Sequence, residues 1–192
     1  DVHSIPARRS SDRTWDGTAA ASRCQTISEQ WPDASVPVED CGPRMVVDGL
    51  MFHIDEGEEK LIPAVWHGID EGLVDRVWMP ENDCCSGRLA SADDEIVLDE
   101  HAASGMEIGI GDTVSIGAGH GRMNFTVVGI GYHSQHLYFT QTGSMLPADP
   151  GTFATGYLSD TGIERLANLS AGSANQLLLD VAGSPEYDLQ ST

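Results

Sequence analysis

The sequence predicts an α+β fold of mixed or antiparallel strands with a few short helices, arranged in two small lobes. The most informative segment, residues 93–130, is typical of strand, short helix, glycine turn, strand, loop and strand in that order. Elsewhere strand-like segments come in pairs and helical patterns are short, which favours α+β over a doubly wound sheet. A chain of 192 residues can bury one substantial core or two small lobes that share an interface.

The chain begins with a linker and one helix. Residues 1 to about 16 are polar and rich in Arg and Ser, and we take residues 1–20 as a linker before a folded domain at 21–192. A helix is predicted over Thr18–Trp31, because small and apolar side chains recur near one face until Pro32 stops it. The prolines that follow indicate a loop.

Two strands come next in the predicted order. Arg44–Ile54 and Lys60–Trp66 are both rich in apolar and β-branched residues, and an acidic turn at Asp55–Glu58 joins them. We therefore expect a hairpin here.

The strand–helix unit follows an irregular segment. Ile96 and Leu98 share one face of an extended stretch. Asp99 can cap a short helix, and Gly105 sits where such a helix would stop. The helix carries Ala102 and Ala103 as its apolar residues.

Glycines then mark the turns between two further strands. Gly109 and Gly111 indicate a tight entry into a strand at Thr113–Ile116, and Phe125–Ile130 is typical of a more buried strand. The Gly-rich residues 117–121 between them have no Gly-Lys-Ser/Thr and no helix after them, so they predict a hairpin turn rather than a phosphate loop.

The C-terminal part combines strands with a last helix. His136–Thr140 and Phe153–Leu158 alternate like strands. Thr161–Glu164 fits a capping box that opens a helix running through Leu169. Asn175–Val181 is predicted as the closing strand.

Three of these segments resemble the extracytoplasmic domain of FtsX-like (MacB-type) ABC-transporter permeases. Asp94–Leu98 is similar to the family's acidic strand, Gly109–Val114 to its Gly-hydrophobic-Gly-Asp-Thr-Val turn, and Phe125–Ile130 to the strand that follows. The resemblance covers roughly residues 44–182. It extends to Ser86–Leu89, Val65–Asp70, Gln135–Tyr138, Leu146–Pro150 and Phe153–Leu158.

The resemblance implies a non-catalytic lobe on the extracytoplasmic side of the cell membrane, with a β-rich lobe around residues 84–135 and residues 1–20 close to the membrane. In such permeases a separate cytoplasmic ATPase subunit uses ATP, so no cofactor is expected in this domain, and the permease is expected to be a dimer. No Walker motif occurs in the chain, in keeping with that division of work. The implied extracellular partner is a peptide, a lipoprotein or a cell-wall protein.

The net charge of the chain narrows the range of expected partners. The formal net charge is −20 and Lys60 is the only lysine. Such a field repels phosphate backbones and anionic lipid headgroups. The charge therefore disfavours binding to nucleic acid or to headgroups. Solubility at a cell surface or adaptation to salt explains the charge, and attraction to cationic peptides is the alternative. No apolar run approaches the roughly 20 residues of a spanning helix, and the N-terminus lacks a signal-peptide pattern; membrane helices are expected to flank the domain.

The four cysteines, Cys24, Cys41, Cys84 and Cys85, make disulfides the default outside the cytoplasm. Vicinal Cys84 and Cys85 seldom bond each other, so Cys24 with Cys41, or each of these with one of the vicinal pair, is expected. A zinc site would usually offer a Cys-x-x-Cys spacing, which is absent here.

The sequence gives only weak signals for a catalytic or metal-binding group of residues. His133 and His136 are the only close histidine pair, but residues three apart in a strand face opposite ways and no third ligand has a fixed spacing. Half-exposed imidazoles at a strand–turn–strand corner are therefore expected, with His53 and His67 satisfied or solvent-facing. Acidic neighbours disfavour a cysteine nucleophile, and Gly-x-Ser-x-Gly does not occur. We expect no catalytic, cofactor or metal residue.

Apolar residues outside the motifs suggest a contact surface. Tyr138, Phe139, Met145 and Leu146 are the candidate partner surface, because Met145 and Leu146 lie in a predicted loop. Trp66, Trp78 and Met79 could also contribute to a peptide or partner surface, but packing in the core is the expectation for them. A secreted or surface-anchored binding module is the competing hypothesis, and a disulfide-bearing hydrolase is a weaker third.

Overall fold

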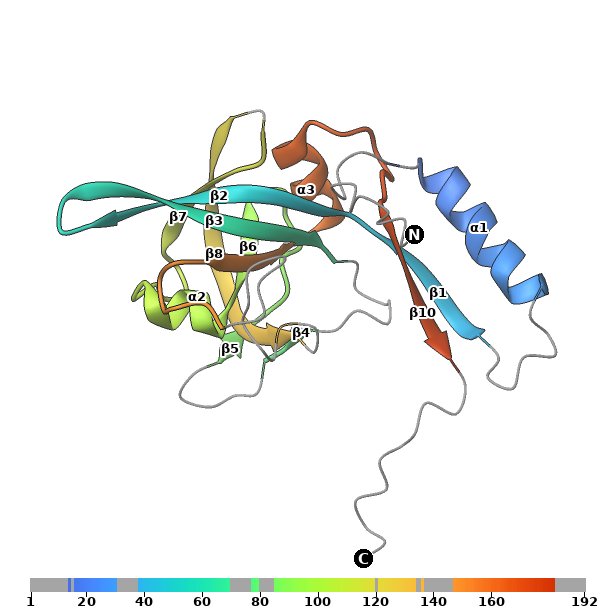
Figure 1. Cartoon of the computed structure of the whole chain (residues 1–192), viewed down its shortest axis with the longest axis horizontal. Helices are drawn as coiled ribbons and strands as arrows, with labels where there is room; N and C mark the ends of the chain where they lie inside the picture. Colours follow the sequence, from blue (N-terminus) through green and yellow to red (C-terminus); the bar gives the residue numbers. More distant parts are fainter. Residues whose placement is uncertain are drawn as a thin grey trace, which may run out of the picture.

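The computed structural model describes residues 14, 16–30, 38–69, 77–79, 85–119, 121–133, 136 and 147–181. Their order along the chain mixes strands with three short helices and confirms the predicted α+β class (Figure 1). The elements are α1 (Gly17–Gln30), β1 (Val38–Arg44), β2 (Val46–Asp55), β3 (Glu58–Gly68), β4 (Val77–Trp78), β5 (Ser86–Gly87), β6 (Glu95–Asp99), α2 (Glu100–Gly105), β7 (Thr113–Gly117), β8 (Arg122–His133), β9 (Ala154–Leu158), α3 (Asp160–Ala167) and β10 (Gln176–Val181).

The larger sheet closes on itself. Neighbouring strands run in the order β8-β6-β9-β3-β2-β7, and β7 pairs back onto β8. Strands β6 and β8 are parallel, as are β3 and β9, whereas the other pairs around the ring are antiparallel. Closing a sheet in this way removes its free edges and encloses a single core.

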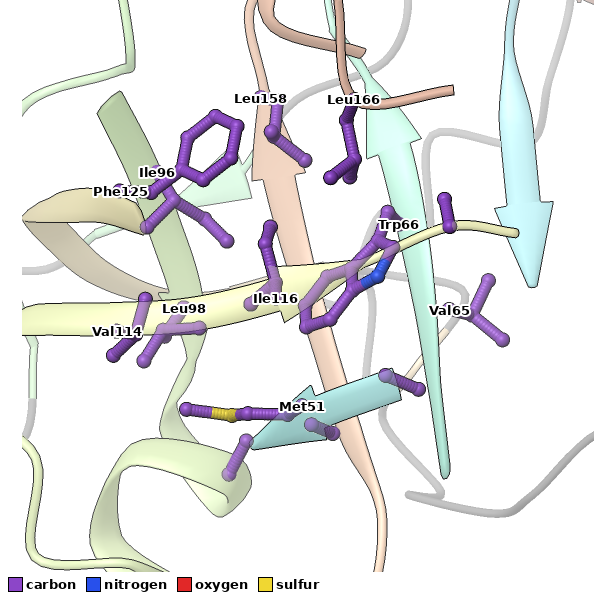
Figure 2. Close-up of a cluster of buried hydrophobic side chains, with 14 of the residues drawn as sticks. Met51, Val65, Trp66, Ile96, Leu98, Val114, Ile116, Phe125, Leu158 and Leu166 are labelled. Carbon is purple, nitrogen blue, oxygen red and sulfur yellow. The ribbon is translucent and has the colours of Figure 1, made fainter. Parts of the chain in front are cut away.

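Large apolar side chains fill the enclosed space (Figure 2). Trp66 is fully buried, and its indole N–H donates to the carbonyl oxygen of Gly117 at 3.2 Å. A Cβ at Gly49 would lie 2.3 Å from the Trp66 Nε1 atom, so glycine is needed on β2 for the indole to fit. The other labelled members of this cluster are Met51, Val65, Ile96, Leu98, Val114, Ile116, Phe125, Leu158 and Leu166.

Helix α2 follows β6 directly. Asp99 caps it as predicted, because its Oδ1 accepts a hydrogen bond from the backbone N–H of His101 at 3.1 Å. Ala102 and Ala103 are buried against the core. The short helix therefore anchors the chain between β6 and β7.

Helix α3 begins earlier than the predicted capping box. Its N-cap is Ser159, whose Oγ accepts from the N–H of Gly162 at 3.1 Å, so the cap at Thr161 is wrong. Ser159 Oγ also lies 3.0 Å from the Ala92 carbonyl oxygen. This tertiary hydrogen bond selects Ser159 over Thr161 as the cap. The helix ends at Asn168, in the left-handed region with φ of 52°.

A second sheet lies outside the closed one. Strand β1 pairs antiparallel with β10 to form a two-stranded ribbon, and α1 lies beside β1 (Figure 1). The loop expected before Arg44 is thus partly a strand. The helix predicted at Thr18–Trp31 corresponds to α1, which begins within the residues expected to be linker.

The strands within 84–135 do not form a sheet of their own. Strands β5 to β8 share the closed sheet with β2, β3 and β9. The boundary between the two sheets instead falls at Met45, between β1 and β2, and at the start of β10.

Candidate functional site

The four residues predicted as a partner surface, Tyr138, Phe139, Met145 and Leu146, lie outside the described residues. That surface stays a prediction. Of the other aromatic candidates, Trp66 is core, as expected, whereas Trp78 is 65% exposed and so does not pack in the core.

Two of the cysteines, Cys41 and Cys85, are disulfide-bonded. Cys84 and the side chain of Cys24 lie outside the described residues, so the predicted pairings stay predictions. A bonded sulfur carries no thiolate, and neither Cys41 nor Cys85 is a nucleophile in this state.

Four ring side chains gather on the outer face of the closed sheet, and we name them the histidine–tyrosine cluster: His67, His133, His136 and Tyr157. The pairing of β3 with β9 sets His67 opposite Tyr157. Because Trp66 and Leu158 point into the core, their neighbours His67 and Tyr157 point to the other face. His133 ends β8, and His136 follows three residues later.

The rings of the cluster are close to one another. Tyr157 lies 5.6 Å from His67 and 5.5 Å from His133 between ring centroids, and the His67 and His136 centroids are 4.9 Å apart. The Nε2 atoms of His67 and His136 are separated by 3.1 Å. His67, His133 and Tyr157 are buried, while His136 is half-buried. The half-exposed imidazole expected at His133 is therefore wrong, because that side chain is buried, whereas His136 is half-buried as expected. Of the two alternatives for His67, the solvent-facing one is wrong, and the Nε2 atom of this buried ring has His136 as its partner.

A buried carboxylate connects the cluster to α2. The Tyr157 hydroxyl donates to Asp99 Oδ2 at 3.3 Å, and His101 Nδ1 lies 2.9 Å from Asp99 Oδ1. Asp99 is fully buried. Burial raises the pKa of its carboxyl above the ordinary value, although the hydrogen bonds from His101 and Tyr157 act in the opposite direction.

The sequence patterns bear on these residues one at a time and do not predict that their side chains lie next to one another. The spacing of His133 and His136 was visible, but His67 and Tyr157 are 90 residues apart and meet only through the parallel pairing of β3 and β9. The available signal was local: each directly adjoins an inward-facing core residue. Imidazoles in this arrangement can share protons or coordinate a transition metal.

A second polar arrangement joins the ribbon to the closed sheet, and we name it the ribbon clamp: Arg44, Val46, Asn175 and Gln176. Asn175 Oδ1 accepts from the Val46 N–H at 2.9 Å, and its Nδ2 donates to the Val46 carbonyl at 2.7 Å. The Asn175 N–H donates to the Arg44 carbonyl at 3.1 Å. The buried Arg44 guanidinium donates to Gln176 Oε1 through Nε and Nη2.

The surface also has grooves, which are separate from the histidine–tyrosine cluster. Two adjoining open grooves lie beside the β2–β3 hairpin. His53 and Glu107 line both of them, and Phe52 and Arg122 line only one. Neither is lined by the histidine–tyrosine cluster.

In the part of the chain that the structure describes, no helix combines the length and apolar character needed to span a membrane.

Comparison with known proteins gives a likeness in structure alone. No family model and no curated protein matches the chain. Among solved structures, the chain is similar to the extracellular domain of the noncanonic ABC-type transporter YknZ from Gram-positive bacteria. The TM-score is 0.44 at 11% identity, over 84% of this chain and 74% of that one. At so low a similarity, the fold described above stands on this chain's own hydrogen bonds and packing.

Proposed function

We propose that this chain is a non-catalytic extracytoplasmic domain of an ABC-transporter permease. It relays the conformational cycle of a separate cytoplasmic ATPase subunit to substrate export or to an extracellular peptide, lipoprotein or cell-wall partner. The permease acts as a dimer in the cell membrane, and this domain uses no cofactor. The proposal begins from the family motifs at Asp94–Leu98, Gly109–Val114 and Phe125–Ile130.

The observation that carries the proposal is the β1–β10 ribbon. Val38 lies opposite Val181 and Arg44 opposite Gln176, so the two connections to the closed sheet run side by side in opposite directions (Figure 1). A domain inserted between two successive membrane helices requires its entry and exit to lie together. The ribbon supplies that geometry.

The ribbon clamp supports a relay because it makes the connection stiff. Only Met45 separates β1 from β2, and the hydrogen bonds from Asn175 hold β10 against that junction. A displacement of the ribbon is then passed to the closed sheet as a rotation of the whole lobe rather than absorbed in a loop.

The proposal is tested on the full-length protein in native membranes. The complete reading frame should encode hydrophobic segments of spanning length on both sides of this domain, and an ABC ATPase subunit should co-purify with it. Asn175→Ala should reduce the transport-coupled ATPase activity of that complex, whereas Asn124→Ala, at an exposed position on β8, should not. A reading frame without flanking hydrophobic segments contradicts the proposal.

One observation favours the competing function, a secreted or surface-anchored binding module. Leu50, Ile54 and Leu61 are 38%, 66% and 58% exposed, and all face outward on the β2–β3 hairpin. Such an apolar stripe is typical of a contact surface. A binding module would retain its partner as an isolated domain, and no ATPase subunit would accompany it.

A further inference from the structure

We propose that the histidine–tyrosine cluster is a transition-metal site in which the Nε2 atoms of His67 and His136 bind one zinc ion. The ion would tie the end of β3 to the segment that follows β8. This site is independent of the transporter function proposed above, since it concerns the outer face of the closed sheet and not the ribbon.

The distance between the two nitrogens fits a shared metal. Zinc binds imidazole nitrogen at about 2.0–2.1 Å and prefers tetrahedral geometry. Two nitrogens at that distance from one ion, and 3.1 Å from each other as here, subtend an angle of about 100° at the metal. This angle is close to the tetrahedral value, so the ion fits between His67 and His136 without a change in their separation.

The direction of the rings also fits a shared metal, in the place of the hydrogen bond that joins the two nitrogens in its absence. The centroids of His67 and His136 are 4.9 Å apart, clearly less than two rings aligned head to head across 3.1 Å would require. The two ring axes are therefore inclined to the line between the nitrogens. Two ligands of one metal converge on it at an angle in the same way.

The surroundings hold the two ligands in place. His67 packs on Tyr157, which the Asp99 carboxylate holds through its hydroxyl. Val97 and Ile69 form an apolar base together with Tyr157. Rings fixed by packing bind a metal with less loss of side-chain freedom.

Two histidine ligands leave further coordination positions of the ion for water or another ligand. The His133 centroid lies 6.4 Å from that of His67 and 5.9 Å from that of His136, and its ring stacks on Tyr157. Among the described residues, no three His, Cys, Asp or Glu side chains meet at a common metal position. The described ligand set is therefore two histidines, and imidazole ligation suits zinc, copper or nickel.

The test is a titration of metal-stripped protein with zinc chloride, followed by calorimetry and thermal unfolding. We expect one zinc ion per chain and a rise in the unfolding temperature with zinc concentration, since the ion binds the folded state. His136→Gln, at a half-buried position, should abolish both effects. Binding should also weaken in acid, because the metal competes with protons for the imidazole.

A control variant separates ligation at this site from the loss of any imidazole. His53→Gln removes an imidazole on β2 and should change nothing. In the unsubstituted protein, zinc should shift the imidazole ¹⁵N resonances of His67 and His136 but not those of His53. Absence of zinc binding by the unsubstituted chain overturns the proposal. Unchanged binding by His136→Gln, or zinc-induced shifts confined to other histidines, also overturns it.

Discussion

The Asn175 side-chain amide makes two hydrogen bonds with the backbone of Val46, accepting from its N–H at 2.9 Å and donating to its carbonyl oxygen at 2.7 Å. The two residues are 129 positions apart in the chain. Val46 lies opposite His67 of β3, and β7 pairs with β2 only from Leu50 to Phe52. Asn175 thus bonds to the start of β2 ahead of the part that pairs with β7. The clamp joins the start of β2 to the residue that precedes β10.

Asn175→Ala should lower the free energy of unfolding by about 1–3 kcal/mol, the cost of leaving partly buried backbone groups without their partner. Denaturant unfolding at neutral pH measures this. Asn175→Asp keeps the acceptor for the Val46 N–H but loses the donor to its carbonyl, so it should fall between the alanine variant and the unsubstituted protein. Equal stability of all three proteins would contradict the role of the clamp.

Trp66 and Trp78 form a matched pair, one fully buried and the other 65% exposed. Trp66→Ala should cost about 3–5 kcal/mol because it empties the centre of the core. Trp78→Ala should change stability by less than about 0.5 kcal/mol. Thermal or denaturant unfolding of both variants gives the comparison, and a larger loss at Trp78 than at Trp66 would refute the assignment of the core.

Local patterns in the sequence predict much of the fold. Asp99 caps α2 as expected, because an N-cap depends only on residues within one helical turn. The β2–β3 hairpin and the turn between β7 and β8 follow in the same way from alternating apolar residues and intervening turn residues.

The parts that were missed depend on partners far away in the chain. Strand β1 carries Pro43 and acidic residues and has no clear alternation, so only its pairing with β10 makes it a strand. Likewise, His67 and Tyr157 adjoin only through the parallel pairing of β3 and β9. A local pattern contains no information on such register, which explains why the cluster could not be predicted.

Glu95 gives a pH-dependent prediction. Arg88 donates to both oxygens of this carboxylate, and the N–H groups of Ser91 and Ala92 lie 3.0 and 3.1 Å from Oε2. These bonds, led by those from Arg88, hold the pKa of Glu95 well below its usual range. The stabilisation is therefore complete above the unfolded pKa of about 4.3 and is lost as pH falls toward the folded pKa.

Glu95→Gln should accordingly be less stable than the unsubstituted protein at pH 7, and the difference should shrink as pH is lowered below about 4. Unfolding in urea at a series of pH values measures it. Glu59→Gln is the matched control, because Glu59 pairs with Arg122 where both side chains are well exposed, and such pairs contribute little. A stability difference for Glu95→Gln that stays constant with pH would show that the ionised carboxylate is not the source.

Asp99 should respond to pH in the opposite direction. Burial raises the pKa of its carboxyl in the folded protein, so its contribution is fully present below the unfolded pKa of about 3.9 and is lost as pH rises through the folded pKa. Asp99→Asn keeps an oxygen to cap α2 and has no charge to bury, so its stability relative to the unsubstituted protein should increase between pH 4 and about pH 7. Asp99→Ala removes the cap and should cost about 1 kcal/mol at every pH by that loss. Unfolding of the three proteins across this range decides the point: an asparagine variant that loses relative stability as pH rises would mean that the ionised carboxylate, held by His101 and Tyr157, is the favoured state despite its burial.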